Sequence, residues 1–206
     1  MGNTAEKQRR RYRRRLLRRR SAPVLFCLLF LGMLSGFAVK AGAKERIDQT
    51  GRSITVPDHP RRVVSLAPSI TEIVFALDRG DRLAGATRFS DYPAAARKLP
   101  KVGSYVHLDL ERITSLAPDL CIAVKDGNPI EVIRRLEGLG IPVFAVDPRD
   151  LDSVMTAIVQ IGRLLNAADR ADALVRDMED RIGRIHRRAQ AAPHRPGVFL
   201  DRKSVV

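Results

Sequence analysis

The chain has 206 residues and a formal net charge of +14, which would ordinarily suggest binding to nucleic acid. The charge is concentrated at one end, however, because the first twenty residues hold ten Lys or Arg and only one Glu. Beyond Ala43 the balance falls to 26 Lys or Arg against 22 Asp or Glu. The composition therefore argues against a nucleic-acid-binding protein, and we expect no nucleic acid partner.

An uncharged apolar segment follows the basic start. Residues 21–39 carry no charge and contain the string PVLFCLLFLGMLSGFAV, after which Ala41 and Ala43 supply small residues. This order is typical of a secretory signal peptide, which we predict over 1–43. The segment is also close to the ~20 residues that span a bilayer, so an uncleaved membrane anchor is the alternative. In both cases the rest of the chain is expected to be exported, to the periplasm or to the outer side of a membrane.

After residue 43 the sequence alternates between apolar strands and amphipathic helices. A short hairpin is predicted over 47–57, with Thr50 and Gly51 at its turn. Further strands are predicted at 62–68, 82–89, 119–124 and 142–146, and helices at 69–78, 94–99, 108–116, 129–139 and 151–165. Strands that are apolar throughout are typical of a parallel sheet covered on both faces, so residues 44–166 are predicted to form one α/β lobe.

Several polar residues near the helix starts have a purely structural interpretation. Ser69 with Glu72 three residues later matches a capping box, and Asp109 is a favourable N-cap. Asp91 and Asn128 also precede predicted helices and can be interpreted as caps.

A long linker helix is predicted over 167–191. Seven apolar residues recur there at spacings of three and four, namely Ala171, Leu174, Val175, Met178, Ile182, Ile185 and Ala189. At ~1.5 Å per residue such a helix is about 35 Å long, which suits a spacer between two lobes. The string RPGVFL predicts that 192–200 begins a second lobe. Residues 201–206 match what a widely used sequencing adapter encodes in this frame, and we expect them to be an artefact.

Motifs for catalysis and for metal binding are missing from the sequence. It contains no GxGxxG or GxxxxGK[ST] loop and no GxSxG elbow. The four histidines are His59, His107, His186 and His194, and their spacing is not that of a metal site. Cys121 lies in an apolar run and is expected to be a small buried hydrophobe. We therefore expect no enzyme, no bound metal and no cofactor.

Polar and aromatic residues instead gather in the segments that follow the predicted strands. Open parallel sheets bind ligands outside the carboxyl ends of their strands. The segments concerned are APS, RFSDYP and KDGNP, with GSYVHLD between the last two. The candidate ligand-binding residues are Ser69, Arg88, Phe89, Tyr105, Gly127 and Asn128.

The strings SLAPSITEI, SDYP and LERI…L-x-PDL, in this order and spacing, resemble the substrate-binding proteins of cobalamin and iron-siderophore ABC importers. The similarity extends over about 47–200, and SDYP with KDGNP most resembles the cobalamin-binding branch. It implies two α/β lobes joined by one long helix, with the ligand in the cleft between them. On this basis the chain holds the N-terminal lobe, the helix and the first strand of the C-terminal lobe.

The resemblance also implies particular roles. Phe89 and Tyr105 stand where cobalamin binders place a tyrosine and a tryptophan against the corrin ring. Glu111 matches a glutamate that pairs with arginines of the membrane permease. The implied function is an extracytoplasmic solute-binding protein that captures cobalamin and delivers it to an ABC importer.

Two alternatives stay open. Val124 occupies a position that is tryptophan in the familiar cobalamin binder, which leaves haem or a ferric siderophore as the ligand of the same scaffold. An anionic siderophore would require Lys or Arg in the cleft, where Arg88 is the only candidate by sequence. The second alternative is a membrane-anchored enzyme or sensor domain built on an α/β lobe.

Overall fold

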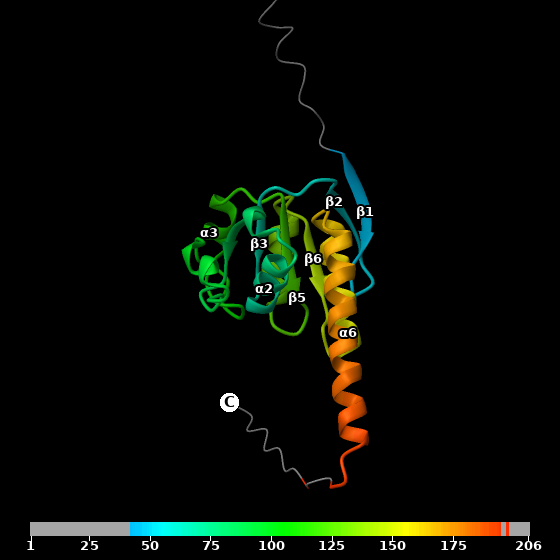
Figure 1. Ribbon diagram of the computed structural model, residues 1–206. Helices are drawn as coiled ribbons and strands as arrows, with labels where there is room; N and C mark the ends of the chain where they lie inside the picture. Colours follow the sequence, from blue (N-terminus) through cyan, green and yellow to red (C-terminus); the bar gives the residue numbers. More distant parts are fainter. Residues whose placement is uncertain (1–41, 195–196, 198–206) are drawn as a thin grey trace, which may run out of the picture. The chain divides into compact units, whose positions relative to one another are not determined.

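A computed structural model describes residues 42–194 and 197 (Figure 1). Apart from a few residues at their borders, the predicted signal peptide, the predicted strand in 192–200 and the tail 201–206 lie outside this described part. Within it, no helix combines the length and the apolar character that crossing a membrane requires.

A two-stranded antiparallel hairpin begins the described part. β1 (Ala43–Ile47) pairs with β2 (Ser53–Pro57), with Ala43 opposite Pro57 and Ile47 opposite Ser53. Gly51 in the turn has a φ of +82°, a conformation that glycine adopts without steric cost. The predicted hairpin and its turn are confirmed.

Four parallel strands form the centre of the fold. They are β3 (Val63–Ser65), β4 (Leu83–Ala86), β5 (Leu120–Val124) and β6 (Val143–Val146), in the order β4-β3-β5-β6. Nearly all of their residues are buried, which explains why the strands are apolar throughout rather than alternating. The predicted α/β class with a parallel sheet is confirmed.

Helices cover both faces of this sheet. The α-helices that follow strands are α2 (Pro68–Ala76), α3 (Leu110–Ser115), α4 (Ile130–Gly138) and α5 (Leu151–Leu164), and the short 3₁₀ helices are η1 (Gly80–Arg82) and η2 (Ala94–Lys98). Leu120 and Ile122 pack with α2 and α5 in one apolar cluster. Their neighbour Cys121 packs with α3 and α4 in a second cluster. The sheet is therefore the middle layer of three.

The predicted caps at Ser69 and Asp91 are wrong. α2 begins at Pro68, one residue before Ser69, so Ser69 lies inside the first turn and no side chain caps this helix. η2 likewise begins after Pro93 without a cap from Asp91. Asp109 is confirmed as the cap of α3, because its carboxylate accepts a hydrogen bond from Arg112 N at 3.0 Å.

The last helix is α6 (Ala168–Gln190), as the apolar stripe predicts. Its start lies beside the end of α2, where Arg170 Nε donates to Ala76 O at 3.0 Å. Met178 still packs against the first apolar cluster, whereas Ile185 is 67% exposed. The second half of α6 extends past the edge of the sheet at which the parallel strands end (Figure 1).

Candidate ligand-binding site

The carboxyl ends of β3, β4, β5 and β6 lie along one edge of the sheet. The strand order reverses between β3 and β5, because β4 flanks β3 on one side and β5 on the other. A reversal of this kind creates the crevice in which open α/β sheets bind ligands. The loops that carry the candidate residues all start from this edge.

Large apolar side chains are exposed mainly at this edge. Of nine exposed large hydrophobic residues in the described part, six lie in its loops or begin the helices that start there. These six are Phe89, Tyr92, Tyr105, Val106, Ile130 and Leu151. Exposed apolar surface that is gathered in one place marks a binding site more often than isolated exposed residues do.

The segment TRFSDYP divides into buried and exposed residues. Thr87 and Ser90 are buried, whereas Arg88 and Phe89 are exposed. Arg88 Cζ lies 4.7 Å from the centre of the Phe89 ring, a favourable cation–π distance. The segment therefore presents a flat aromatic ring together with a cation at the strand ends.

A chain of four buried hydroxyl groups fixes this segment to the sheet. Thr87 Oγ1 lies 3.0 Å from Ser90 Oγ, which lies 3.0 Å from Thr71 Oγ1. Thr71 Oγ1 lies 2.8 Å from Ser65 Oγ, which donates to Ala67 O at 2.8 Å. Each hydroxyl has one proton, so Thr71 Oγ1 donates either to Ser65 Oγ or to Ser90 Oγ at any one time. The loop that carries Phe89 is thus tied to β3 and α2.

Asn128 is buried and serves neither as a helix cap nor as an open polar group. The N-cap of α4 is Pro129, and Asn128 is 7% exposed. Its Nδ2 donates to Leu66 O and to Tyr105 O, both at 2.8 Å, and its Oδ1 accepts from Val124 N at 2.8 Å. The predicted cap is therefore wrong, because the amide joins three loops instead.

Gly127 lies against the ring of Tyr105. A Cβ atom at this position would stand 3.1 Å from Tyr105 Cδ2, so the absence of a side chain allows the ring to pack on the backbone. Tyr105 as a whole is still 41% exposed. The structure thus brings the predicted residues Tyr105, Gly127 and Asn128 together.

Two cations at this edge were missed from the sequence. Lys125 Nζ lies 3.0 Å and Arg149 Nη2 lies 2.8 Å from Asp147 Oδ2. The hydrogen bond from Arg149, supported by the one from Lys125, lowers the pKa of the Asp147 carboxyl. The prediction that Arg88 is the only nearby cation is therefore wrong. Lys125 begins the KDGNP string, and Arg149 stands in the polar string that follows the last predicted strand.

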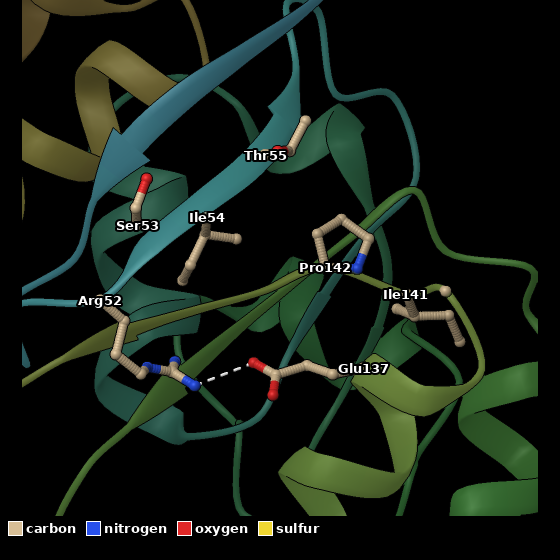
Figure 2. Close-up of a pocket in the computed structure, with 8 residues that line it drawn as sticks. Arg52, Ser53, Ile54, Thr55, Glu137, Ile141 and Pro142 are labelled. Atoms are coloured by element: carbon tan, nitrogen blue, oxygen red, sulfur yellow. Dashed lines mark hydrogen bonds and ion pairs between the residues drawn. The ribbon is translucent and has the colours of Figure 1, made fainter.

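Two hollows differ in their position relative to this edge. One of about 210 Å³ lies near the ends of β5 and β6 and is lined by apolar side chains of β5, β6 and α4 and by the polar residues Thr50, Arg52, Lys125 and Asn128. Another of about 420 Å³ lies where α4 ends and β6 begins, with Arg52, Glu137 and Pro142 in its wall (Figure 2). The larger hollow is therefore at the opposite edge from the candidate site.

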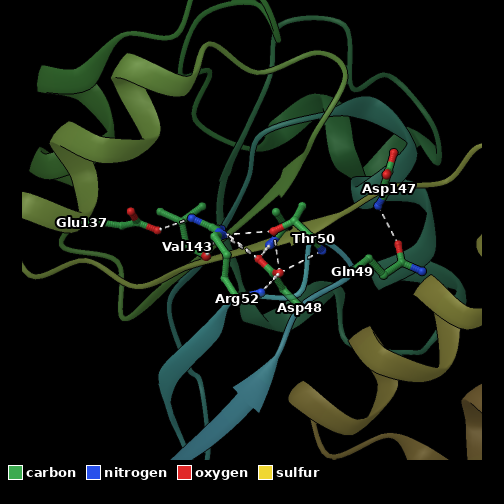
Figure 3. A network of polar contacts seen from close by, with 8 residues as sticks. Asp48, Gln49, Thr50, Arg52, Glu137, Val143 and Asp147 are labelled. Carbon is green, nitrogen blue, oxygen red and sulfur yellow. Dashed lines mark hydrogen bonds and ion pairs between the residues drawn. The ribbon is translucent and has the colours of Figure 1, made fainter.

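The hairpin turn covers the outer edge of β6 (Figure 3). Gln49 N donates to Ala145 O at 3.1 Å, Gln49 Oε1 accepts from Asp147 N at 2.6 Å, and Arg52 Nη2 donates to Val143 O at 3.2 Å. Asp48 orders this turn by accepting from Thr50 and from Arg52. Two carbonyl groups of β6 and the N–H group of the residue that follows it are thereby hydrogen-bonded to the hairpin turn.

No group of His, Cys, Asp or Glu side chains within residues 42–194 is arranged to hold a metal ion. The carboxylate of Asp109, close to His107 in the sequence, is engaged with Arg112 instead.

The described part is a parallel α/β unit with exposed aromatic residues at the carboxyl ends of its strands, which is the form of a ligand-binding lobe. Residues 63–200 match the Periplasmic binding protein family, and the chain belongs to that family.

Similar proteins are named as vitamin B12-binding or heme-binding proteins. A vitamin B12-binding protein of Pectobacterium atrosepticum is 34% identical over 148 residues, 69% of this chain and 52% of that protein. A periplasmic heme-binding protein from Pseudomonas aeruginosa is 32% identical with a TM-score of 0.61, covering 64% of this chain and 48% of that one. The periplasmic vitamin B12-binding protein of Vibrio cholerae is 29% identical with a TM-score of 0.60, covering 64% and 52%.

The chain spans about half the length of the curated relatives it matches. The family match and these neighbours are binding proteins, which agrees with the expectation that the chain is not an enzyme.

Proposed function

We propose that this chain is one lobe of an exported solute-binding protein that captures cobalamin and delivers it to an ABC importer. The observation that carries the proposal is the concentration of exposed aromatic residues at the carboxyl ends of the parallel strands. Phe89 and Tyr105 lie there on loops that are held by hydrogen bonds from Thr71 and Asn128. Aromatic rings of this kind bind a flat, largely apolar macrocycle by stacking and apolar contact. Two curated relatives that are 34% and 36% identical are named vitamin B12-binding proteins.

A second candidate ligand is haem. It is favoured by Lys125, Arg149 and Arg88, which place cations near the same edge and would suit the carboxylates of a haem. The similarity to a heme-binding protein at 32% identity supports this alternative. Ferric siderophores are a third candidate on the same scaffold.

Titration of the full gene product with cyanocobalamin, haemin and a ferric hydroxamate distinguishes these ligands. Absorbance of the ligand and calorimetric heat provide independent measurements. We expect saturable binding of cyanocobalamin that is clearly tighter than that of the other two. Equal or tighter binding of haemin would contradict the corrinoid assignment, and binding of none of the three would contradict the proposed function.

The variant Phe89→Ala tests the placement of the site. Loss of a stacking side chain at the centre of a small-molecule site is expected to weaken cyanocobalamin binding by about tenfold to a hundredfold. Leu139→Ala is the matched control, since Leu139 is 60% exposed but follows α4 at the opposite edge. An unchanged dissociation constant in Phe89→Ala would show that the ligand binds elsewhere.

A further inference from the structure

The crevice between β3 and β5 is bridged from inside by Asn128. Two of the residues that it joins are Leu66, which directly follows β3, and Val124, the last residue of β5. The third partner, Tyr105, comes from the loop before α3. One side chain therefore connects the floor of the candidate site with the loop that carries its aromatic ring.

The hydrogen-bonding capacity of Asn128 is used within the protein. An amide side chain has two N–H donors, and both are engaged with backbone carbonyls. Its oxygen accepts from Val124 N, and the residue is 7% exposed. The amide therefore has no donor left for a ligand, and direct recognition by Asn128 is not supported by this geometry.

Apart from its bond to Asn128, the loop around Tyr105 is joined to the Phe89 segment by Arg88 N, which donates to Gly103 O at 2.8 Å, and is otherwise closed on itself. Ser104 N donates to His107 O, and His107 N donates to Ser104 Oγ, both at 2.9 Å. These bonds shape the turn but do not attach it to β5. Attachment comes from the bond between Asn128 Nδ2 and Tyr105 O, and Gly127 supports the ring from beneath.

We propose that Asn128 is a positioning residue of the candidate ligand-binding site, because it holds Tyr105 in the orientation that receives the ligand. The inference about affinity rests on the proposed function, whereas the inference about Tyr105 does not. Phe89 is held independently by the hydroxyl chain through Thr71. The two aromatic residues are thus positioned by different side-chain ties, Thr71 for Phe89 and Asn128 for Tyr105, although one backbone bond from Arg88 N to Gly103 O joins their segments.

The main test is Asn128→Asp, which keeps the shape of the side chain and removes both N–H donors. At neutral pH the new carboxylate faces the carbonyls of Leu66 and Tyr105, so Tyr105 is released. Burial and these carbonyls raise the pKa of the new carboxyl above its usual value. Lowering the pH adds a proton that can donate to one carbonyl, which restores part of the attachment.

Fluorine NMR of the full gene product labelled with 3-fluorotyrosine reports on Tyr105 without any ligand. The signal is assigned with Tyr105→Phe. We expect the Tyr105 signal to shift and narrow in Asn128→Asp at neutral pH and to return partly towards its wild-type position as the pH falls. The apparent affinity for cyanocobalamin should fall by about tenfold, as expected when a loop holds its binding conformation about a tenth of the time.

Thr71→Val is the matched control, since it removes a buried polar contact of the other tie. It should alter the signal of 4-fluorophenylalanine at position 89, assigned with Phe89→Leu, and leave the Tyr105 signal in place. An unchanged Tyr105 signal in Asn128→Asp would overturn the proposal. An equal Tyr105 shift in Thr71→Val would also overturn it, because it would indicate general loosening.

Gly127→Ala provides a second route if Asn128→Asp does not fold. The added methyl group displaces the Tyr105 ring and leaves the Asn128 amide intact. A shifted Tyr105 signal with weaker cyanocobalamin binding supports the proposal, and a shifted signal with unchanged binding overturns it. If the wild-type protein binds none of cyanocobalamin, haemin and the ferric hydroxamate, the proposed function fails while the Tyr105 signals still decide the positioning role.

Discussion

Burial separates the candidate residues at the carboxyl ends of the parallel strands, which we call the ligand edge, into two groups. Thr87, Ser90 and Asn128 are buried and hydrogen-bonded, so they hold the loops in place. Arg88 and Phe89 are exposed and free to meet a ligand. A buried polar group that loses its partner costs about 1–3 kcal/mol, so the first group is also important for stability.

Burial also suppresses the reactivity of the Cys121 thiol. It is fully buried in β5, and burial, together with the nearby Asp119, raises the pKa of its thiol to about 12. The thiolate is the reactive form, so the folded protein contains almost none of it at pH 8. The sequence-based expectation of a buried hydrophobe is confirmed.

Thiol labelling tests this prediction. In a Cys27→Ser variant, Cys121 should react with Ellman's reagent at pH 8 only after denaturant is added, with an increase in rate of about a hundredfold or more. A Ser115→Cys substitution on the exposed surface of α3 gives the control rate for a free thiol. Rapid labelling of folded Cys121 would contradict the assigned burial.

At the scale of elements, the hairpin turn covers the outer edge of β6, the last strand of the parallel sheet. An uncovered edge strand presents free N–H and C=O groups to other chains. Here Gln49 and Arg52 occupy such groups on β6, and Arg52 also forms an ion pair with Glu137 at 2.9 Å. The hairpin turn thus protects the outer edge of β6 through individual hydrogen bonds, without pairing with β6 as a regular strand.

The turn depends on the ionised form of Asp48. Burial by itself raises the pKa of Asp48, but hydrogen bonds from Thr50 and Arg52 and the charge of Arg52 outweigh it, so the pKa is lowered. A carboxyl with a lowered folded-state pKa stabilises the protein above its unfolded value of about 3.9. This contribution is lost as the pH falls through the folded-state pKa.

Asp48→Asn should therefore lower the free energy of unfolding by about 2 kcal/mol at neutral pH. The difference from the wild type should shrink as the pH drops below about 4. Urea denaturation at a series of pH values measures it, with the exposed Asp81→Asn as the control. A difference that is independent of pH would rule out the ionised Asp48 as its source.

At the scale of the whole molecule, α6 has two different halves. Its first half packs on the apolar cluster through Leu174, Val175 and Met178, and its second half continues past the ligand edge with Ile185 exposed. A helix of 23 residues is about 35 Å long, more than the short strands beside it require. This arrangement agrees with the proposed linker to a second lobe.

Glu111 is proposed to dock the protein on its importer. It lies exposed in the first turn of α3, where an acid is also favoured by the helix dipole, by ~0.3–1 kcal/mol. Docking requires the negative charge at the surface, whereas ligand binding does not. The two roles can be separated by experiment.

Glu111→Arg is expected to leave the affinity for cyanocobalamin unchanged and to abolish uptake in cells that depend on this importer. Glu131→Arg, in the exposed first turn of α4, controls for the change in charge. Normal uptake by Glu111→Arg would refute the docking role.

Local patterns in the sequence were sufficient for most of the fold. Continuous apolar strings predicted β3, β5 and β6, and the three-and-four spacing predicted α6, because both signals come from residues close together in the chain. The aromatic candidates Phe89 and Tyr105 could be located for the same reason, since each follows a recognisable element.

Tertiary structure alone decided which loop residues are tied and which are free. Asn128 reaches Leu66 across 62 positions of sequence, and Arg52 reaches Glu137 across 85. The sequence by itself determined the alternation of strands and helices and placed the candidate ligand-binding residues after the strands. Burial of Asn128, the hydroxyl chain of Thr71 and the cations beside Asp147 follow from contacts between distant segments, which no local pattern records.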